Sequence, residues 1–158
     1  TKDRMFLKMT KDDWDAVMDL NLKAVFFTAQ AFARACLAQG TGGAIVNIAS
    51  LLSFQGGIRV PSYTAAKHGV AGLTKILANE WAAKGITGNA IAPGYIATNN
   101  TTALRADADR NRAILERIPA GRWGAPSDIG WTAAFLCTPA ASYIQGAVLN
   151  VDGGWLAR

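Results

Sequence analysis

Residues 43–50 have the sequence Gly-Ala-Ile-Val-Asn-Ile-Ala-Ser, in which residues 44–49 form a continuous apolar run behind a glycine cluster. An apolar run of this length between turn residues is typical of a β-strand that is covered on both faces, as in a parallel sheet. A second run spans residues 86–92 and is closed by Pro93-Gly94, and a third spans residues 147–151. We therefore expect three buried strands.

Helical periodicity fills the intervals between these runs. Apolar residues recur at helical spacing over Thr10–Gln39, and Asp13 lies three residues after Thr10, as in an approximate capping box. A second helix is expected at about Tyr63–Lys84, with Gly85 ending it, and a third at about Ser127–Cys137, with its N-cap at Ser127. Helices that alternate with short buried strands indicate a parallel α/β sheet with right-handed crossovers.

The composition is that of one globular domain of 158 residues, 51% hydrophobic and 17% charged. The net charge of +5 comes from scattered lysines and arginines, which indicates solubility and no nucleic-acid partner. Cys36 and Cys137 lie far apart in apolar helical stretches, so we expect two buried free thiols in a reducing cytoplasm. No apolar stretch reaches the roughly 18 residues of a membrane-spanning helix, and no membrane partner or metal site is expected.

Tyr63 and Lys67 are four residues apart on a predicted helix, so their side chains share one face. An ammonium group beside a phenol favours the phenolate and lowers the tyrosine pKa from its usual value of about 10, which makes a proton donor and acceptor near neutral pH. Ser50 ends a predicted strand and therefore lies at the carboxyl edge, where open parallel sheets bind ligands. Because Tyr-Lys pairs also occur by chance on helix surfaces, the pair needs its context.

The order of motifs along the chain resembles the short-chain dehydrogenase/reductase family. Asn21 in Leu-Asn-Leu, Ser50 before Tyr63, Pro93-Gly94, and the turn at residues 152–154 occur together and in the family's order. The resemblance implies the C-terminal part of a doubly wound, Rossmann-like parallel-sheet fold with three αβα layers. It also implies an NAD(P)-dependent oxidoreductase that forms a homo-oligomer of two or four chains.

The resemblance further implies roles for single residues. Tyr63 would exchange a proton with the substrate oxygen, Lys67 would hold the nicotinamide ribose and lower the pKa of Tyr63, and Ser50 would hydrogen-bond the substrate carbonyl or alcohol. Asn21 would anchor a water that relays protons towards Lys67. The loop that flanks the nicotinamide would contain four matching residues, Pro93, Gly94, Ile96 and Thr98.

Finer features look like the sugar-acid dehydrogenases of this family, which act on 2-deoxy-gluconate and 2-dehydro-3-deoxy-gluconate. They lie in residues 53–63, 97–101, 114–119, 122–124 and 152–158, whereas residues 1–30 look closer to the acyl-thioester ketoreductases. Residues 95–122 are polar and are expected to form a lid or substrate loop. Four side chains near this lid suit a hydroxylated anion, because guanidinium pairs with carboxylate: Arg59, Asn99, Asn100 and Arg105. A merely solvated or structural role for the arginines stays open.

Several other residues invite a functional interpretation that we do not adopt. His68 directly follows Lys67 and so lies on a different helix face. Three tryptophans are expected to serve packing or subunit contact: Trp81, Trp123 and Trp131.

Two residues depart from the family pattern. Gly88 replaces a β-branched residue, which should weaken its strand, and Trp131 replaces a small residue in a helix that packs closely.

No glycine-rich turn for a dinucleotide pyrophosphate is found. Gly40–Gly43 follows a helix and enters a strand, the reverse of the order that phosphate binding requires. The chain also opens in mid-pattern without an initiating methionine, so we expect the family's N-terminal dinucleotide-binding portion to be absent. NAD or NADP is then expected only with that portion present, and the exposed sheet edge should favour self-association.

Three functions stay open on the sequence alone. The first is a dehydrogenase whose remainder lies elsewhere or is supplied in trans. The second is a short protein without dinucleotide binding that performs other acid-base chemistry on carbohydrate, such as hydrolysis, and the third is a non-catalytic remnant. Glycoside hydrolysis requires paired carboxylates, and no convincing pair is found among those available, Glu80, Asp107, Asp109, Glu116 and Asp128.

Overall fold

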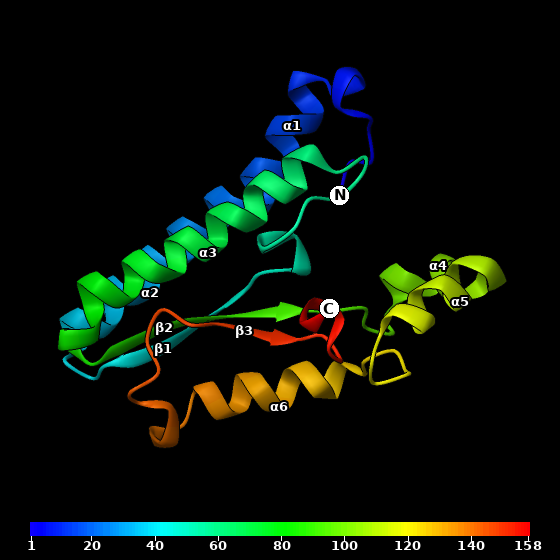
Figure 1. The fold of residues 1–158 in the computed structure, drawn as a ribbon. Helices are drawn as coiled ribbons and strands as arrows, with labels where there is room; N and C mark the ends of the chain where they lie inside the picture. The colour runs from blue at the N-terminus through cyan, green and yellow to red at the C-terminus, as the bar shows by residue number, and fades with distance from the viewer.

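A computed structural model describes all residues, 1–158, and places a three-stranded parallel sheet between helical layers (Figure 1). The strands are β1 (Gly43–Ile48), β2 (Ile86–Pro93) and β3 (Val148–Val151), in the order β1-β2-β3. The α-helices are α1 (Lys11–Met18), α2 (Ala24–Gln39), α3 (Pro61–Trp81), α4 (Thr102–Ala106), α5 (Ala108–Arg117) and α6 (Pro126–Leu136). The predicted parallel α/β fold is confirmed.

Helices α2 and α3 cover one face of the sheet and α6 covers the other, which gives the three layers (Figure 1). Helix α3 lies close to the central strand β2. A Cβ atom on Gly88 would lie 2.9 Å from the Cβ of Leu77, a distance that forces a shift. Gly88 therefore has a physical reason in this fold: the close approach of α3 leaves no room for the β-branched residue that a strand normally favours.

Strand β1 lies at one edge of the sheet and is less covered than expected. Its burial alternates instead of being complete, and Ile48 at its end is 48% exposed. The prediction that this strand is covered on both faces is thus wrong for part of it. The reason is its place in the sheet: only β2 pairs with β1, and the other edge has no neighbour among residues 1–158. An unpaired parallel edge is a template for association.

The first predicted helix forms, but it is not one regular helix. The Thr10 hydroxyl accepts the N–H of Asp13 at 3.1 Å, which confirms the N-cap, whereas the Asp13 carboxylate contacts Arg4 at 3.2 Å and does not complete the capping box. A π-helical segment, Asp19–Lys23, separates α1 from α2. Such segments insert one extra residue into a helix and are frequent at functional sites.

Of two further local predictions, one is confirmed and one is wrong. Gly85 adopts φ +75° and ends the 3-10 turn that follows α3, as expected. The N-cap of α6 is Ala125 rather than Ser127, because Pro126 occupies the first helical position and the Asp128 carboxylate accepts the Ala125 N–H at 2.8 Å.

The free thiols and the tryptophans differ in exposure. Cys36 is buried as predicted, but Cys137 is exposed, because it is the C-cap residue beyond the buried last residue of α6, Leu136. Trp81 and Trp123 pack against buried clusters, whereas Trp131 is 76% exposed and has no packing role within the chain. None of the helices combines the length and the apolar composition that crossing a membrane requires.

Candidate active site

Ser50 and Tyr63 come together because β1 and α3 meet at the carboxyl edge of the sheet. Ser50 directly follows β1, and its side chain accepts the N–H of Leu52 at 3.2 Å, which fixes the start of a short 3-10 turn. Tyr63 lies in the first turn of α3, where Pro61 at the first position suits a helix start. The Ser50 side chain lies near enough to the Tyr63 hydroxyl to lower the pKa of the tyrosine. Two groups that can exchange a proton thus share one site.

Lys67 lies one turn after Tyr63 on the same face of α3, as the spacing predicts. Its Nζ lies 5.4 Å from the centroid of the Tyr63 ring and donates a hydrogen bond to the Ile48 carbonyl at 2.8 Å. The backbone carbonyl of Lys67 accepts a bond from the buried hydroxyl of Ser53 at 2.7 Å. Sequence reasoning assigned no role to Ser53 or Ile48, since neither a small serine nor a backbone carbonyl carries a motif.

The electrostatics of this pair differ from expectation. Burial raises the pKa of Tyr63 above its usual value, and the hydrogen bond with Ser50 opposes that rise only in part. Burial lowers the pKa of Lys67. The prediction that Lys67 lowers the pKa of Tyr63 is therefore wrong for this structure: the pKa is raised, burial is the main cause, and only Ser50 opposes the rise. Both shifts favour the neutral side chain.

Asn21 lies in the π-helical segment between α1 and α2, and its side-chain amide donates to the Val17 carbonyl at 3.1 Å. Asn21 and Lys67 both line a mainly apolar groove of about 460 Å³ between α2 and β1. The structure thus brings Asn21 and Lys67 to the same groove. Ser50 and Tyr63 do not line this groove.

The loop after β2 holds the four residues expected to flank a nicotinamide. Pro93 ends β2, and Gly94 lies so near the chain after β3 that a Cβ on it would be 2.6 Å from the Asp152 Cα. Ile96 pairs with Gly124 in an isolated parallel bridge. The Thr98 carbonyl accepts bonds from the lid helices, so the loop is fixed at both ends.

The four predicted substrate residues lie further out. Arg59 is exposed, with φ +69°, and its carbonyl accepts the Arg4 N–H at 2.8 Å. Asn99 and Asn100 are exposed in the 3-10 turn before α4, and Arg105 donates to the Thr98 carbonyl at 3.2 Å. No hydrogen bond or ion pair joins these side chains to Ser50 or Tyr63. They border the lid but are not assembled around the tyrosine.

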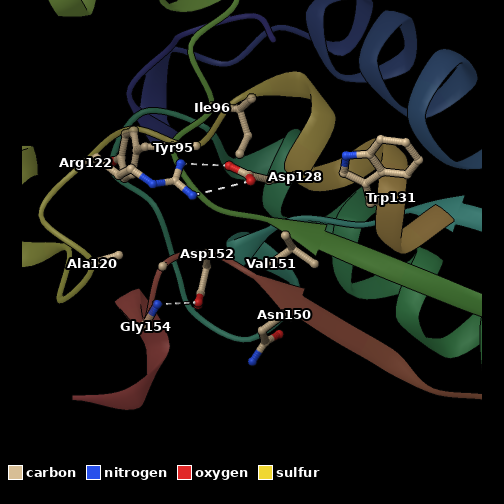
Figure 2. A pocket seen from close by; sticks show the side chains of 12 residues that line it. Tyr95, Ile96, Ala120, Arg122, Asp128, Trp131, Asn150, Val151, Asp152 and Gly154 are labelled. Atoms are coloured by element: carbon tan, nitrogen blue, oxygen red, sulfur yellow. Dashed lines mark hydrogen bonds and ion pairs between the residues drawn. The ribbon is translucent and has the colours of Figure 1, made fainter. Parts of the chain in front are cut away.

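A second cavity, of about 420 Å³, lies at the same edge on the α6 side (Figure 2). Arg122 forms an ion pair with Asp128 at 2.8 Å there, and Asp152 accepts the Gly154 N–H at 2.9 Å. These carboxylates are engaged by the fold, which holds the pKa of Asp128 below its usual value through the bonds from Arg122 and Ala125. The cavity contains neither Ser50 nor Tyr63.

His68 is exposed, and its Nδ1 lies 3.0 Å from the Thr64 carbonyl. It takes no part in the cluster, as its helix face predicts.

A family model described as enoyl-(acyl carrier protein) reductase, of the short-chain dehydrogenase type, matches residues 1–156. The chain belongs to the short-chain dehydrogenase/reductase family. It is 61% identical over 152 residues to a 2-dehydro-3-deoxy-D-gluconate 5-dehydrogenase of Escherichia coli, a match that covers 96% of this chain and 60% of the relative. The chain thus spans about three fifths of the length of the curated relatives it matches.

Solved structures agree with this family membership. A candidate 2-deoxy-D-gluconate 3-dehydrogenase of Agrobacterium tumefaciens with bound NADP has 72% identity and a TM-score of 0.97, and the match covers 99% of this chain and 63% of that one. A gluconate 5-dehydrogenase of Burkholderia cenocepacia in complex with NADP and tartrate has 38% identity and a TM-score of 0.94, with 99% and 61% covered. The doubly wound, Rossmann-like class expected from the resemblance is confirmed by such neighbours.

Proposed function

We propose that residues 1–158 form the catalytic portion of an NAD(P)-dependent dehydrogenase that transfers a hydride between a nicotinamide cofactor and a secondary alcohol or ketone of a sugar acid. The observation that carries the proposal is the cluster of Ser50, Tyr63 and Lys67 at the carboxyl edge of a parallel sheet. The similarity to enzymes named for 2-dehydro-3-deoxy-D-gluconate and gluconate supports the substrate class.

In this proposal Tyr63 exchanges the proton of the substrate oxygen, since it is the only hydroxyl of the cluster with a neighbouring ammonium group. Ser50 holds the same oxygen by a hydrogen bond and orients it towards Tyr63. Lys67 uses one of its three N–H donors on the Ile48 carbonyl and keeps the others for a ribose and for a water held near Asn21. Protons then pass from Tyr63 towards the groove beside Asn21.

The residues present fit the nicotinamide end of a dinucleotide. Lys67 is buried at 7% exposure yet borders an open groove, so its remaining donors can reach a ligand there. Pro93, Gly94, Ile96 and Thr98 would flank the ring and its carboxamide. The cofactor would supply the hydride acceptor or donor. The glycines between α2 and β1 lead from helix to strand and offer no phosphate turn.

The substrate is proposed to be a hydroxylated acid held by Arg59, Asn99, Asn100 and Arg105. Arg59 forms no ion pair, and the two asparagines form no side-chain hydrogen bond, so their polar groups are available to an incoming ligand. The lid would have to move to bring them to the tyrosine. It is loosely packed, because α4 has no buried residue and α5 has one. Two cysteines without a disulfide are compatible with action in a reducing cytoplasm.

The carboxylates offer no support for glycoside hydrolysis. Asp128 is paired with Arg122, Asp107 caps α5 by accepting the Arg110 N–H, and Asp109 is paired with Arg112. These three are thus engaged by hydrogen bonds or ion pairs, which leaves Glu80 in α3 and Glu116 in α5. A hydrolase would need two free carboxylates on either side of one bond, and these two lie in different helices.

A dehydrogenase assay tests the proposal. Joined to the N-terminal dinucleotide-binding portion expected for the family, the chain should oxidise 2-deoxy-D-gluconate, or reduce 2-dehydro-3-deoxy-D-gluconate, with NAD(H) or NADP(H), followed by absorbance of the reduced nicotinamide. A nicotinamide titration without substrate separates binding from chemistry. Binding without turnover would contradict the substrate class, and neither binding nor turnover would contradict the dehydrogenase assignment for this chain.

The chain is also proposed to be a homo-oligomer, and light scattering should give a mass well above the 16.7 kDa of one chain at micromolar concentration. The large exposed apolar side chains of α2 support this expectation: Phe26, Phe27, Phe32 and Leu37. A matched measurement on Phe27→Ser tests the α2 surface separately. A monomer mass for the unchanged chain would contradict the proposal.

A further inference from the structure

The lid helix α5 ends in a turn that leaves two of its carbonyl groups without amide donors. A helix does not satisfy its last carbonyls internally, and at this end they include those of Glu116 and Arg117. The three residues that follow Ile118 supply no donor. Pro119 has no N–H, and the amides of Ala120 and Gly121 donate to other carbonyls, at 2.9 Å each.

Arg158, the last residue of the sequence, supplies the missing donors. Its Nη2 donates to the Glu116 carbonyl at 2.6 Å and its Nε to the Arg117 carbonyl at 3.3 Å. A cation at this end of a helix is also favoured by the helix dipole. The Arg117 guanidinium in turn stacks over the Trp155 ring at 4.0 Å from its centroid. The last turn of α5 is therefore held by two arginine contacts at once.

The turn after β3 brings these groups into place. The Asp152 carboxylate accepts the N–H group of Gly154 at 2.9 Å (Figure 2). It also accepts the N–H group of Leu156 at 3.0 Å, and the two bonds fix the turn after β3. Gly153 has φ +64°, and a Cβ on it would lie 2.8 Å from the Ile118 side chain, so glycine allows the close packing. We call residues 152–158 the lid clamp.

The lid clamp is in direct contact with the side of the candidate active site. Ile114 and Ile118 of the lid pack with Leu51 and Trp155 in one buried cluster. Leu51 directly follows Ser50. A change in the position of α5 therefore acts directly on Leu51, the residue next to Ser50.

The opposite end of the lid is held less firmly. Helix α4 has no buried residue, and its contacts with the loop after β2 are hydrogen bonds at an exposed surface, such as that from Arg105 to Thr98. The bonds from Arg158 are exposed as well, so the two ends differ in buried packing: Ile114 and Ile118 pack with Trp155 in a buried cluster at the clamped end, and exposed bonds alone open at low cost. The position of α5 is thus determined mainly by its clamped end.

We propose that the lid clamp sets the position of α5 over the carboxyl edge beside Ser50, and that Arg158 is a positioning residue for sugar-acid binding. The substrate part of this inference rests on the proposed function, while the placement of α5 does not. Arg158 touches no reacting atom and acts through α5 and Leu51.

Amide hydrogen exchange on the full chain tests the clamp. Arg158→Ala should speed exchange of the α5 amides at residues 114–118 by about tenfold, because the last turn frays once its carbonyls lose their donors. Arg158→Lys should restore part of the protection. Arg112→Ala is the matched control, since it removes an exposed arginine from the same helix that contacts only Asp109. Amides of α3 serve as the internal reference and should not change.

A second variant and a kinetic measurement complete the test. Arg117→Gln removes the contact with Trp155 and should also speed α5 exchange. With 2-deoxy-D-gluconate and NADP, Arg158→Ala should raise KM about tenfold and leave kcat within about twofold, with partial rescue by Arg158→Lys. Unchanged α5 exchange in both Arg158→Ala and Arg117→Gln would overturn the clamp. An equal rise in α5 exchange in the control Arg112→Ala would overturn the clamp too. Absence of turnover in the unchanged chain would contradict the proposed function alone, because exchange decides the clamp independently.

Discussion

Tyr63→Phe is expected to lower kcat of the proposed dehydrogenase reaction by about 10²- to 10⁴-fold, the range that a positioned proton donor contributes. Phenylalanine keeps the ring and its packing in the first turn of α3 but has no exchangeable proton. Ser50 alone cannot replace it, because an aliphatic hydroxyl is a much weaker acid than a phenol. KM for the sugar acid should change little, because the lid residues stay in place.

Tyr95→Phe is the matched control for this variant. Tyr95 lies at the same edge but packs its ring against Trp123 and Trp155, at 5.5 and 4.7 Å between centroids. Loss of its hydroxyl should leave kcat within about threefold. Full activity in Tyr63→Phe would mean that the chemistry of the family does not operate in this chain.

Much of the fold could be predicted because local pattern and tertiary environment agree. The apolar runs at 44–49, 86–92 and 147–151 became β1, β2 and β3 within one residue at each end, since glycine and proline limit them. Gly85 at a positive φ likewise ended its helical segment as expected. These features depend on residues that are near in sequence.

The predictions that were wrong depend on neighbours distant in sequence or on geometry without a sequence pattern. The π-helical segment at Asp19–Lys23 has no pattern of its own, because its apolar spacing continues that of the flanking helices. The partial exposure of β1 follows from its place at the sheet edge, and that of Cys137 from the turn after α6. The residues near β1 and Cys137 in the sequence do not determine either exposure.

The candidate site shows the same division. The shared helix face of Tyr63 and Lys67 follows from their spacing and was predicted. The direction of the tyrosine pKa shift was not predicted, because it is set mainly by burial, and burial depends on the packing of α3 against the sheet. The bond from Lys67 to the Ile48 carbonyl likewise needs the register of β1 beside α3.

Lys67→Met is expected to lower kcat about 10²-fold at neutral pH and to weaken nicotinamide binding. Methionine keeps an apolar stem of similar length but donates no hydrogen bond and carries no charge. The variant separates electrostatic from packing roles, because the fold should persist: the Ile48 carbonyl loses its donor, while the cost of burying an ammonium group disappears. Lys75→Met, two turns further along α3 and exposed, is the matched control.

The pH dependence of stability gives this variant a second and independent readout. Burial lowers the pKa of Lys67, so the folded chain binds that proton more weakly than the unfolded chain, whose lysine titrates near 10.5. Between the lowered pKa and 10.5 the unfolded state therefore holds more protons, and the free energy of unfolding of the unchanged chain should rise with pH. Lys67→Met should lack this rise, whereas Lys75→Met should keep it.

Tyr63 makes an opposite contribution, because its raised pKa makes stability fall as pH increases above about 10. That contribution is common to all three proteins and cancels in the differences between them. Denaturant unfolding at pH steps from 7 to 10 measures the differences. A curve for Lys67→Met parallel to that of the unchanged chain would mean that Lys67 is solvated, and that the charge proposed to serve Tyr63 and the ribose is not held in the buried position from which both roles are inferred.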